Sequence, residues 1–253
     1  MPAGSAAWKR CLIIGASSGI GEQLALQLAD SGCDLALVSR RQVELDLVAA
    51  ACSTRSRTSR LFVHSHDVRH FDEVPGLFQE IARELGGLDM VIYSTGVLRV
   101  TGADEYDFEI DREAVEVNLL GAMAWLNEAA LRFQAARAGT IIGISSVAGE
   151  RGRRGSRAYG AAKAALTQYL ESLRNSLTRY GVNVVTIKAG PVATPMTEGM
   201  GKLPLIIPAD VAAKQILRAA HGRSREAYVP RAWGALTPVL RIIPSPVFRK
   251  LSI

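Results

Sequence analysis

One stretch near the start of the chain decides the fold: Gly15-Ala16-Ser17-Ser18-Gly19-Ile20-Gly21. It follows the apolar run 11–14, which predicts a buried strand, and it opens a segment, 20–28, whose apolar side chains have helical spacing. Glycines let the backbone turn sharply and approach a ligand without a Cβ in the way, and the free N–H groups of a helix start favour an anion. The order of strand, glycine-rich turn and helix therefore predicts a pyrophosphate-binding turn. A tight strand–helix connection without a ligand is the alternative.

Short apolar runs alternate with helix-length segments along the rest of the chain. They cover residues 11–14, 35–38, 61–63, 90–93, 140–144 and 182–187. Apolar runs of this length are typical of strands that are buried on both faces of a parallel sheet. Six such strands separated by helices predict an α/β fold, a single-domain doubly wound parallel sheet of the Rossmann type with helices on both faces. We expect this domain to cover residues 1–230.

Composition narrows the class of protein. The 253 residues are 48% hydrophobic and 21% charged, which is typical of a globular domain that needs no disulfide or metal to be stable. The three cysteines, Cys11, Cys33 and Cys52, lack the spacing of a zinc site or a disulfide framework. Their pattern favours a cytoplasmic protein without a metal site.

The net charge of +6 is placed unevenly. Residues 223–253 hold six basic side chains and one acidic one, a net of +5, so that residues 1–222 carry only +1. A nucleic-acid-binding protein would more often spread basic residues over a groove, with aromatic residues between them. The nearly neutral body of the chain therefore argues against nucleic acid as a partner.

The end of the second predicted strand bears on the choice of nucleotide. A dinucleotide fold that reads NAD places a carboxylate there for the ribose 2′-hydroxyl. This chain has Ser39 followed by Arg40 and Arg41. A guanidinium can bind a phosphate with two parallel hydrogen bonds, whereas a carboxylate would repel the 2′-phosphate of NADP. We expect NADP(H) as the cofactor, ahead of NAD(H), held through Ser39 and Arg40; a solvated surface pair is the alternative.

Tyr159 and Lys163 are the strongest catalytic candidates. They lie four residues apart in a segment with helical spacing, so they share one helix face. A phenol with a pKa near 10 is a poor proton donor at neutral pH, and a nearby cation favours the phenolate. Upstream, Ser146 stands at the end of a predicted strand, where open α/β sheets place their ligands. Its hydroxyl could hold a substrate oxygen while Tyr159 exchanges a proton with it.

These motifs resemble the short-chain dehydrogenase/reductase family. The Gly-x-x-x-Gly-x-Gly turn, Ser146, Tyr159 and Lys163 stand at the family's spacing, and Asn118 matches the asparagine that the family uses in a proton relay. The resemblance covers residues 9 to about 230. It implies hydride transfer between a nicotinamide and a carbonyl or secondary alcohol, with Tyr159 as general acid or base and Lys163 lowering its pKa and binding the ribose. It also implies a homo-oligomer.

The resemblance implies further contacts to the cofactor. Asp67 and Val68 match the family's pair at the adenine, and Gly96 matches the glycine after the fourth strand. After the sixth strand, Gly190, Val192 and Thr194 lie in the stretch that the family places beside the nicotinamide. The following residues, 195–208, contain two methionines and two glycines and are expected to form a substrate lid or a simple connector.

Two features bear on the substrate. Four arginines lie between Ser146 and Tyr159, namely Arg151, Arg153, Arg154 and Arg157. They indicate an anionic group on the substrate, or else a solvated loop with Glu150 as its partner. Residues 231–253 are basic, apolar and interrupted by prolines. That mixture is typical of a segment at a membrane interface or over a lipid-like substrate, with packing on its own domain or a partner subunit as the alternative.

Taken together, these two features resemble those of the reductases that convert decaprenylphosphoryl 2-keto-erythro-pentose in mycobacterial cell walls. That resemblance implies a keto sugar linked to a polyprenyl phosphate, and a cytoplasmic enzyme with peripheral membrane contact through residues 231–253. One alternative is a soluble reductase of small carbonyl compounds or 3-ketoacyl thioesters. The other is a regulator that binds NADP without catalysis.

Overall fold

Seven strands of the described chain form one parallel sheet. The computed structural model describes residues 8–55, 60–102 and 104–250. The strands run in the order β3-β2-β1-β4-β5-β6-β9, and each neighbouring pair is parallel. Their bounds are β1 (Arg10–Ile14), β2 (Asp34–Ser39), β3 (Leu61–Ser65), β4 (Met90–Tyr93), β5 (Thr140–Ser146), β6 (Asn183–Ala189) and β9 (Glu226–Val229). The strand order reverses at β1 and β4, and such a point opens a crevice at the carboxyl ends of the strands.

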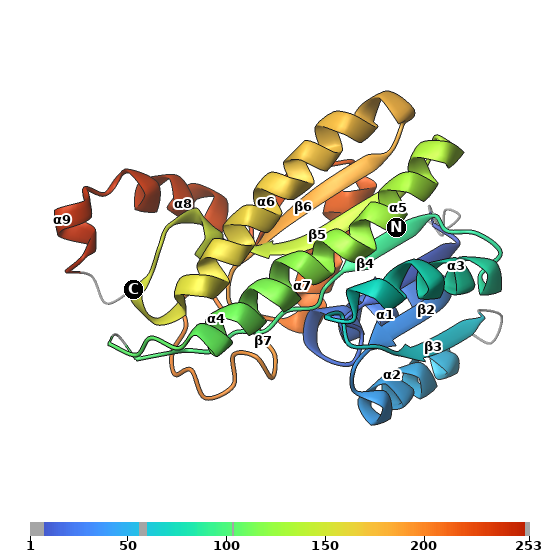
Figure 1. Cartoon of the computed structure of the whole chain (residues 1–253), viewed down its shortest axis with the longest axis horizontal. Coiled ribbons are helices and arrows are strands. Elements are labelled where there is room, and N and C mark those ends of the chain that lie inside the picture. The colour runs from blue at the N-terminus through green and yellow to red at the C-terminus, as the bar shows by residue number, and fades with distance from the viewer. Residues whose placement is uncertain (1–7, 56–59, 103, 251–253) are drawn as a thin grey trace.

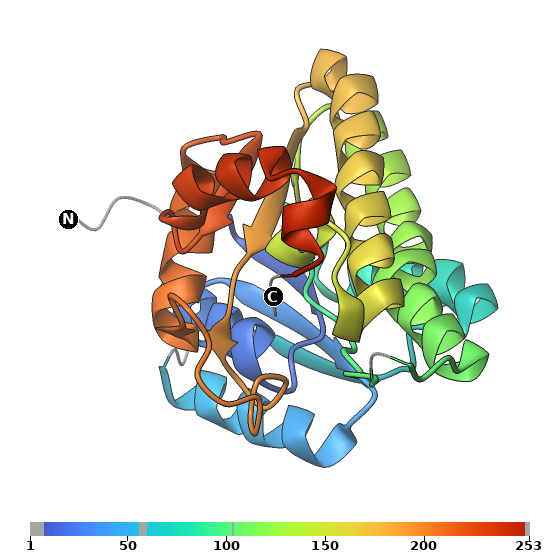
Figure 2. The same ribbon diagram turned by 90° about the vertical axis from the view of Figure 1, so that its left-hand side faces the viewer.

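Helices cover both faces of this sheet (Figure 2). One layer contains α1 (Gly19–Asp30), α2 (Gln42–Arg55) and α7 (Ala209–His221), and the other contains α3 (Val74–Glu84), α5 (Gly121–Ala136) and α6 (Arg157–Leu177). Successive residues of a strand point to opposite faces, so Cys11 and Ile13 pack in the first layer while Leu12 and Ile14 pack in the second. The predicted doubly wound fold is therefore confirmed.

Strand β9 was not predicted, because its four residues include a glutamate and an exposed start and lack the apolar pattern of the other strands. It pairs with β6, with Ala227 opposite Ile187 and Val229 opposite Ala189, and closes the sheet at that edge. A small separate sheet joins β7 (Val192–Ala193) to β8 (Ile207–Pro208).

The segment before α5 contains an irregular helix. The sequence predicts one helix-length segment over 113–137, whereas the structure has α4 (Phe108–Val115), a π-helical turn (Glu116–Leu120) and then α5. Tyr93 at the end of β4 donates a hydrogen bond to the carbonyl of Val117 inside this turn, at 2.7 Å. The π-helical turn is thereby tied to the sheet, and Asn118 within it is fully buried.

The C-terminal segment lies against the domain beyond β6 and β9 (Figure 1). Its helix α8 (Trp233–Ile242) contacts β9 and the turn after β5, and α9 (Ser245–Phe248) follows it. Trp233 is only 3% exposed. The last three residues of the predicted 231–253 segment lie outside the described residues. In the part that the structure describes, no helix is long and apolar enough to cross a membrane.

Candidate active site

A cavity of about 760 Å³ opens at the carboxyl ends of the strands, which is within the usual size range of ligand sites. Every residue predicted to be catalytic or to bind the cofactor lines this cavity except Gly21 and Asn118, which lie behind its wall. The lining members of that set are Gly15, Ser17, Ser18, Gly19, Ile20, Ser39, Arg40, Asp67, Val68, Gly96, Ser146, Tyr159, Lys163, Gly190, Val192 and Thr194. The fold therefore brings together residues from six strand ends.

The turn after β1 requires its glycines. A Cβ on Gly15, whose φ is +94°, would lie 2.6 Å from the backbone nitrogen of Thr95. A Cβ on Gly19, whose φ is +60°, would lie 2.9 Å from Cγ2 of Thr194, and one on Gly21 would lie 2.0 Å from the carbonyl oxygen of Gly15. The glycines thus allow the turn to approach two other loops and the cavity at once.

The start of helix α1 is prepared for an anion. The first backbone N–H groups of a helix have no partner within the helix, and the N-cap residue Ser18 makes no side-chain cap bond to them. Arg41 donates from Nη2 to Oγ of Ser17 at 2.9 Å and to Oγ of Ser18 at 2.7 Å, which places a positive charge over the turn. Free N–H groups, a helix dipole and a guanidinium together fit a pyrophosphate.

Ser39 and Arg40 lie beside the same turn. The Ser39 hydroxyl donates to Oγ of Ser17 at 2.7 Å. Arg40 has a side chain that is 62% exposed, and its Nη1 lies 3.6 Å from a carboxylate oxygen of Asp67. Asp67 is bound more closely by Arg69, at 2.7 Å, and this hydrogen-bonded pairing lowers the pKa of Asp67 to about 2. Arg40 is therefore extended at the cavity rim, with Asp67 held as a carboxylate.

Asn118 holds the loop after β4. Its Nδ2 donates to the carbonyls of Val97, at 2.9 Å, and Ala114, at 2.8 Å, while its Oδ1 accepts from the backbone N–H of Val97. A Cβ on Gly96 would lie 2.9 Å from this Oδ1 and 3.4 Å from Nζ of Lys163. Only a glycine lets the loop pass so close to both side chains.

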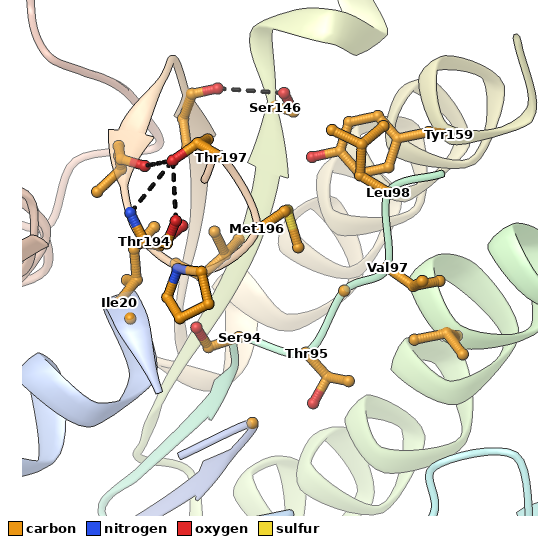
Figure 3. A pocket seen from close by; sticks show the side chains of 18 of the residues that line it. Ile20, Ser94, Thr95, Val97, Leu98, Ser146, Tyr159, Thr194, Met196 and Thr197 are labelled. Carbon is orange, nitrogen blue, oxygen red and sulfur yellow. Dashed lines mark hydrogen bonds between the residues drawn. The ribbon is translucent and has the colours of Figure 1, made fainter. Parts of the chain in front are cut away.

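Ser146 of β5 and Tyr159 of α6 lie close together at the cavity (Figure 3). The Ser146 hydroxyl donates to the carbonyl of Ala189 at 3.2 Å and accepts from the backbone N–H of Ala148. Burial raises the pKa of the Tyr159 phenol, while the Ser146 hydroxyl and the Arg153 guanidinium oppose that rise.

Lys163 lies beneath Tyr159, with its Nζ 5.7 Å from the centre of the ring. The ammonium donates to the carbonyl of Ile144 at 2.9 Å. Burial lowers the pKa of Lys163 to about 7. Because burial disfavours the protonated form of Lys163, its favourable effect on the Tyr159 phenolate is weakened in this structure.

The four arginines after β5 point in different directions. Only Arg153 lines the cavity, whereas Arg151 and Arg154 bind backbone carbonyls of the C-terminal segment and Arg157 binds that of Glu105. Their expected partner, Glu150, has a buried side chain that pairs with Lys188 at 3.0 Å and with Arg241. The alternative of a solvated loop neutralised by Glu150 is therefore wrong.

The segment predicted to be a lid or a connector covers one side of the cavity. Pro195, Met196, Thr197, Met200 and Leu203 line it. Thr197 closes a tight turn by donating to the carbonyl of Val192 at 2.7 Å and by accepting from the N–H of Thr194 at 3.2 Å. Figure 3 places Met196 between this turn and the Tyr159 ring.

The lining also contains residues that were absent from the predicted set, among them Arg41, His66 and Arg153. Arg41 and Arg153 each belong to a cluster of arginines that is visible in the sequence. The sequence does not show which arginine of a cluster faces the cavity. His66 is buried beside Asp67, and nothing in the sequence separates it from a core histidine.

A doubly wound parallel sheet with a glycine-rich turn and a polar cavity at the switch point defines a dinucleotide-binding oxidoreductase fold. The model of the family described as short chain dehydrogenase matches residues 9–203. The chain belongs to the short-chain dehydrogenase family and is an NAD(P)-dependent dehydrogenase or reductase.

Similar proteins include an uncharacterized oxidoreductase of Mycobacterium tuberculosis, 29% identical over 246 residues that make up 96% of this chain and 97% of that protein. An uncharacterized oxidoreductase of Myxococcus xanthus is 30% identical over 95% of both chains. Among solved structures, a short-chain dehydrogenase from Sphingobium yanoikuyae in complex with NADPH has a TM-score of 0.80 and 25% identity, covering 94% of this chain and 97% of its own. One from Mycobacterium paratuberculosis bound to NAD has a TM-score of 0.79 and 22% identity, covering 87% and 94%.

Proposed function

We propose that this protein is an NADPH-preferring reductase of carbonyl compounds, able to oxidise the corresponding secondary alcohols in reverse. The observation that carries the proposal is that Ser146 and Tyr159 meet in the same cavity as the glycine-rich turn. When bound, the nicotinamide supplies the hydride for the carbonyl carbon.

The chain's own residues then handle the oxygen and its proton. The backbone N–H of Ala148 orients the Ser146 hydroxyl, whose proton can turn from the Ala189 carbonyl to the substrate's carbonyl oxygen as negative charge develops there. Tyr159 delivers the proton to that oxygen and becomes a phenolate, which nearby positive charge stabilises. Lys163 binds the cofactor ribose and, once that contact favours its protonated form, lowers the pKa of Tyr159. Asn118 holds the loop at Gly96 close to Nζ of Lys163, where its proposed role is to continue the proton relay from Lys163.

The test of this mechanism compares two tyrosines of one helix. Tyr159→Phe should lower kcat for NADPH-dependent ketone reduction by about 10²–10⁴-fold while NADPH binds as before. Tyr169→Phe on the same helix, where the hydroxyl donates to Asn127, serves as the control and should keep its activity. Unchanged turnover in the Tyr159→Phe enzyme would dismiss the mechanism. Binding of NADPH by the unmodified protein without turnover of any ketone would favour the non-catalytic regulator.

The preference for NADPH rests on the positive charge at the end of β2. Arg40 and Arg41 both line the cavity there, and Ser39 stands where a carboxylate would repel a 2′-phosphate. The resemblance to a structure in complex with NADPH supports this choice, although another similar structure is bound to NAD. Arg40→Ala and Arg41→Ala should each lower the kcat/KM ratio of NADPH to NADH by about tenfold or more, and Ser39→Asp should reverse it. Equal kcat/KM values for the two cofactors in the unmodified enzyme would contradict the proposal.

For the substrate we propose a keto sugar carried on a polyprenyl phosphate, with a small soluble ketone or 3-ketoacyl thioester as the second candidate. The C-terminal segment supports the first, because it exposes apolar side chains beside basic ones, namely Val239, Ile242, Val247, Arg249 and Lys250. Such a surface fits the interface of an anionic membrane. Co-sedimentation with vesicles of phosphatidylserine and phosphatidylcholine tests it: Ile242→Glu with Val247→Glu should abolish the binding. No binding by the unmodified protein would favour the soluble substrates.

We also propose that residues 231–250 belong to the same domain as the sheet and that the enzyme is a homo-oligomer. The burial of Trp233 supports the first point. The second is supported by large apolar side chains that α4 and α5 expose, Phe108 and Leu131 among them. Light scattering coupled to size exclusion should give a mass of two or four chains, and Leu131→Glu should reduce it.

A further inference from the structure

The loop between β5 and α6 is held from both sides of Arg153. Arg151 donates to the carbonyl of Leu240 in α8 at 2.5 Å, and its guanidinium lies 3.9 Å from the centre of the Phe248 ring. Arg154 donates to the carbonyl of Arg249. Arg151 and Arg154, the arginines on either side of Arg153, are thus turned outward and fixed to the C-terminal segment. Arg153 itself lines the cavity.

The charge of Arg153 is not compensated by the protein that surrounds it. Within residues 8–55, 60–102 and 104–250, its guanidinium has neither a hydrogen bond to another side chain nor an ion pair. The acidic side chains that line the cavity are Asp67 and Glu113, and each is already paired with another arginine, Asp67 with Arg69 and Glu113 with Arg99. Burial lowers the pKa of the Arg153 guanidinium, which indicates that water solvates this charge only in part. A partly desolvated guanidinium without a counter-charge is costly, and an anionic ligand would relieve that cost.

Arg153 lies in the part of the cavity that the substrate must enter. It is near enough to Tyr159 to act on the charge of the phenol, and its neighbours Gly155 and Ser156 line the same wall. Apolar side chains also line the cavity, among them Val97, Leu98 and Met196 (Figure 3). The other arginines of the lining, Arg40, Arg41 and Arg99, each lie 3.4–3.6 Å from a carboxylate oxygen. Arg153 is therefore suited to select and orient a ligand that carries an anionic group.

We propose that Arg153 binds an anionic group of the substrate, a carboxylate or a phosphate, beside the carbonyl that Ser146 and Tyr159 hold. This inference rests on the proposed ketone reduction and names the class of its substrates: ketones that carry a carboxylate or phosphate a few bonds from the carbonyl. The other role open to Arg153 is to stabilise the Tyr159 phenolate. The two roles differ in measurable ways, because only the first depends on the charge of the substrate.

The experiment uses matched ketone pairs that differ only in that charge. Acetoacetate is compared with methyl acetoacetate, and dihydroxyacetone phosphate with dihydroxyacetone, which separates carboxylate from phosphate. We expect the unmodified enzyme to prefer the anion of at least one pair by about tenfold or more. Arg153→Gln should raise KM for that anion by about 10- to 100-fold, a loss much larger than any change for its neutral partner, and Arg153→Lys should restore part of the loss.

Arg179→Gln is the matched control, since it removes the same charge about 30 Å away, beyond the far end of α6. It should not change the preference. The inference is overturned if the unmodified enzyme reduces anionic and neutral ketones equally well. It is also overturned if Arg153→Gln lowers kcat for both members of a pair alike and shifts the pH profile, because that result assigns Arg153 to Tyr159.

A binding measurement decides the point even where no tested ketone turns over. Inorganic phosphate or acetate is titrated into the protein–NADPH complex and followed by nicotinamide fluorescence. We expect saturable binding to the unmodified protein and to Arg179→Gln, and binding that is weaker by about tenfold or more in Arg153→Gln. Equal binding to all three proteins overturns the inference. Binding that depends on Arg153 without reduction of any ketone contradicts the proposed reaction but leaves the anion site in place.

Discussion

Replacing Lys163 by methionine should make the cofactor-free protein more stable while it removes activity. Lys163 is only 4% exposed, and its one hydrogen bond in the described structure goes to the carbonyl of Ile144. Burial brings the pKa of its ammonium from the ordinary 10.5 to about 7. A difference of about 3.5 in pKa corresponds to about 5 kcal/mol, which is an upper bound on what the buried charge costs the folded state.

Two effects reduce the gain expected from Lys163→Met. The Ile144 carbonyl loses its donor, which costs about 1–3 kcal/mol, and the flexible methionine fills nearly the same volume at a small cost. We therefore expect the free energy of unfolding to rise by about 1–3 kcal/mol at a pH of about 6. A functional group that destabilises its own fold is a common feature of active sites.

The pH dependence gives this prediction its sign. Because the pKa of Lys163 is lowered in the folded protein, the penalty is complete below a pH of about 7, where the side chain is charged in both states. Between about 7 and 10.5 the unfolded chain binds the extra proton, so the folded protein gains stability as the pH rises, and the advantage of Lys163→Met shrinks. Urea unfolding of both proteins without cofactor at pH values of about 6, 7.5 and 9 measures the difference.

The control is Lys214→Met on the exposed face of α7, which should give a difference that does not change with pH. The reasoning is refuted if Lys163→Met is no more stable than the unmodified protein at a pH of about 6. A difference that stays constant up to a pH of about 9 would refute it as well.

Three other substitutions probe the frame of the site. Gly21→Ala should lower NADPH affinity by about tenfold and stability by about 1–3 kcal/mol, because its Cβ would lie 2.0 Å from the Gly15 carbonyl oxygen; fluorescence titration and urea unfolding measure both. Tyr93→Phe should cost about 1–3 kcal/mol, because it leaves the buried Val117 carbonyl without its donor, and an unchanged urea midpoint would contradict this. Trp233→Ala should free the C-terminal segment, so that limited proteolysis cuts within 233–248 before the rest of the chain unfolds, whereas protection equal to that of the unmodified protein would speak against the anchor.

The parts of the fold that sequence predicts are those fixed by local pattern. Five of the six predicted strands are largely buried on both faces and β3 is half-buried, and each contains an apolar run that stands out from its surroundings. The glycine turn was equally visible, because its backbone conformation excludes other residues. Strand β9 was missed because it lies at the sheet edge and is defined by its pairing with β6, which no local pattern records.

The direction in which each arginine after β5 points could not be predicted either, because it depends on partners that are distant in the sequence. Arg151 and Arg154 are turned outward by partners about 90 residues away in the C-terminal segment, which leaves Arg153 to face the cavity. The π-helical turn at Asn118 was hidden as well, because one extra residue per turn scarcely disturbs the helical pattern of apolar side chains. Its anchor, the Tyr93 hydroxyl, comes from the neighbouring strand.

The contact of Trp233 with Gly190 has a consequence for engineering this enzyme. A Cβ on Gly190 would lie 2.2 Å from the indole nitrogen, so the C-terminal segment rests directly on the loop after β6 while Arg151 fixes it to the loop after β5. The same twenty residues thus brace both loops that border the substrate and leave the glycine turn untouched. Exchanging them as one cassette between related enzymes is a route to new substrate scope with an unaltered glycine-rich turn.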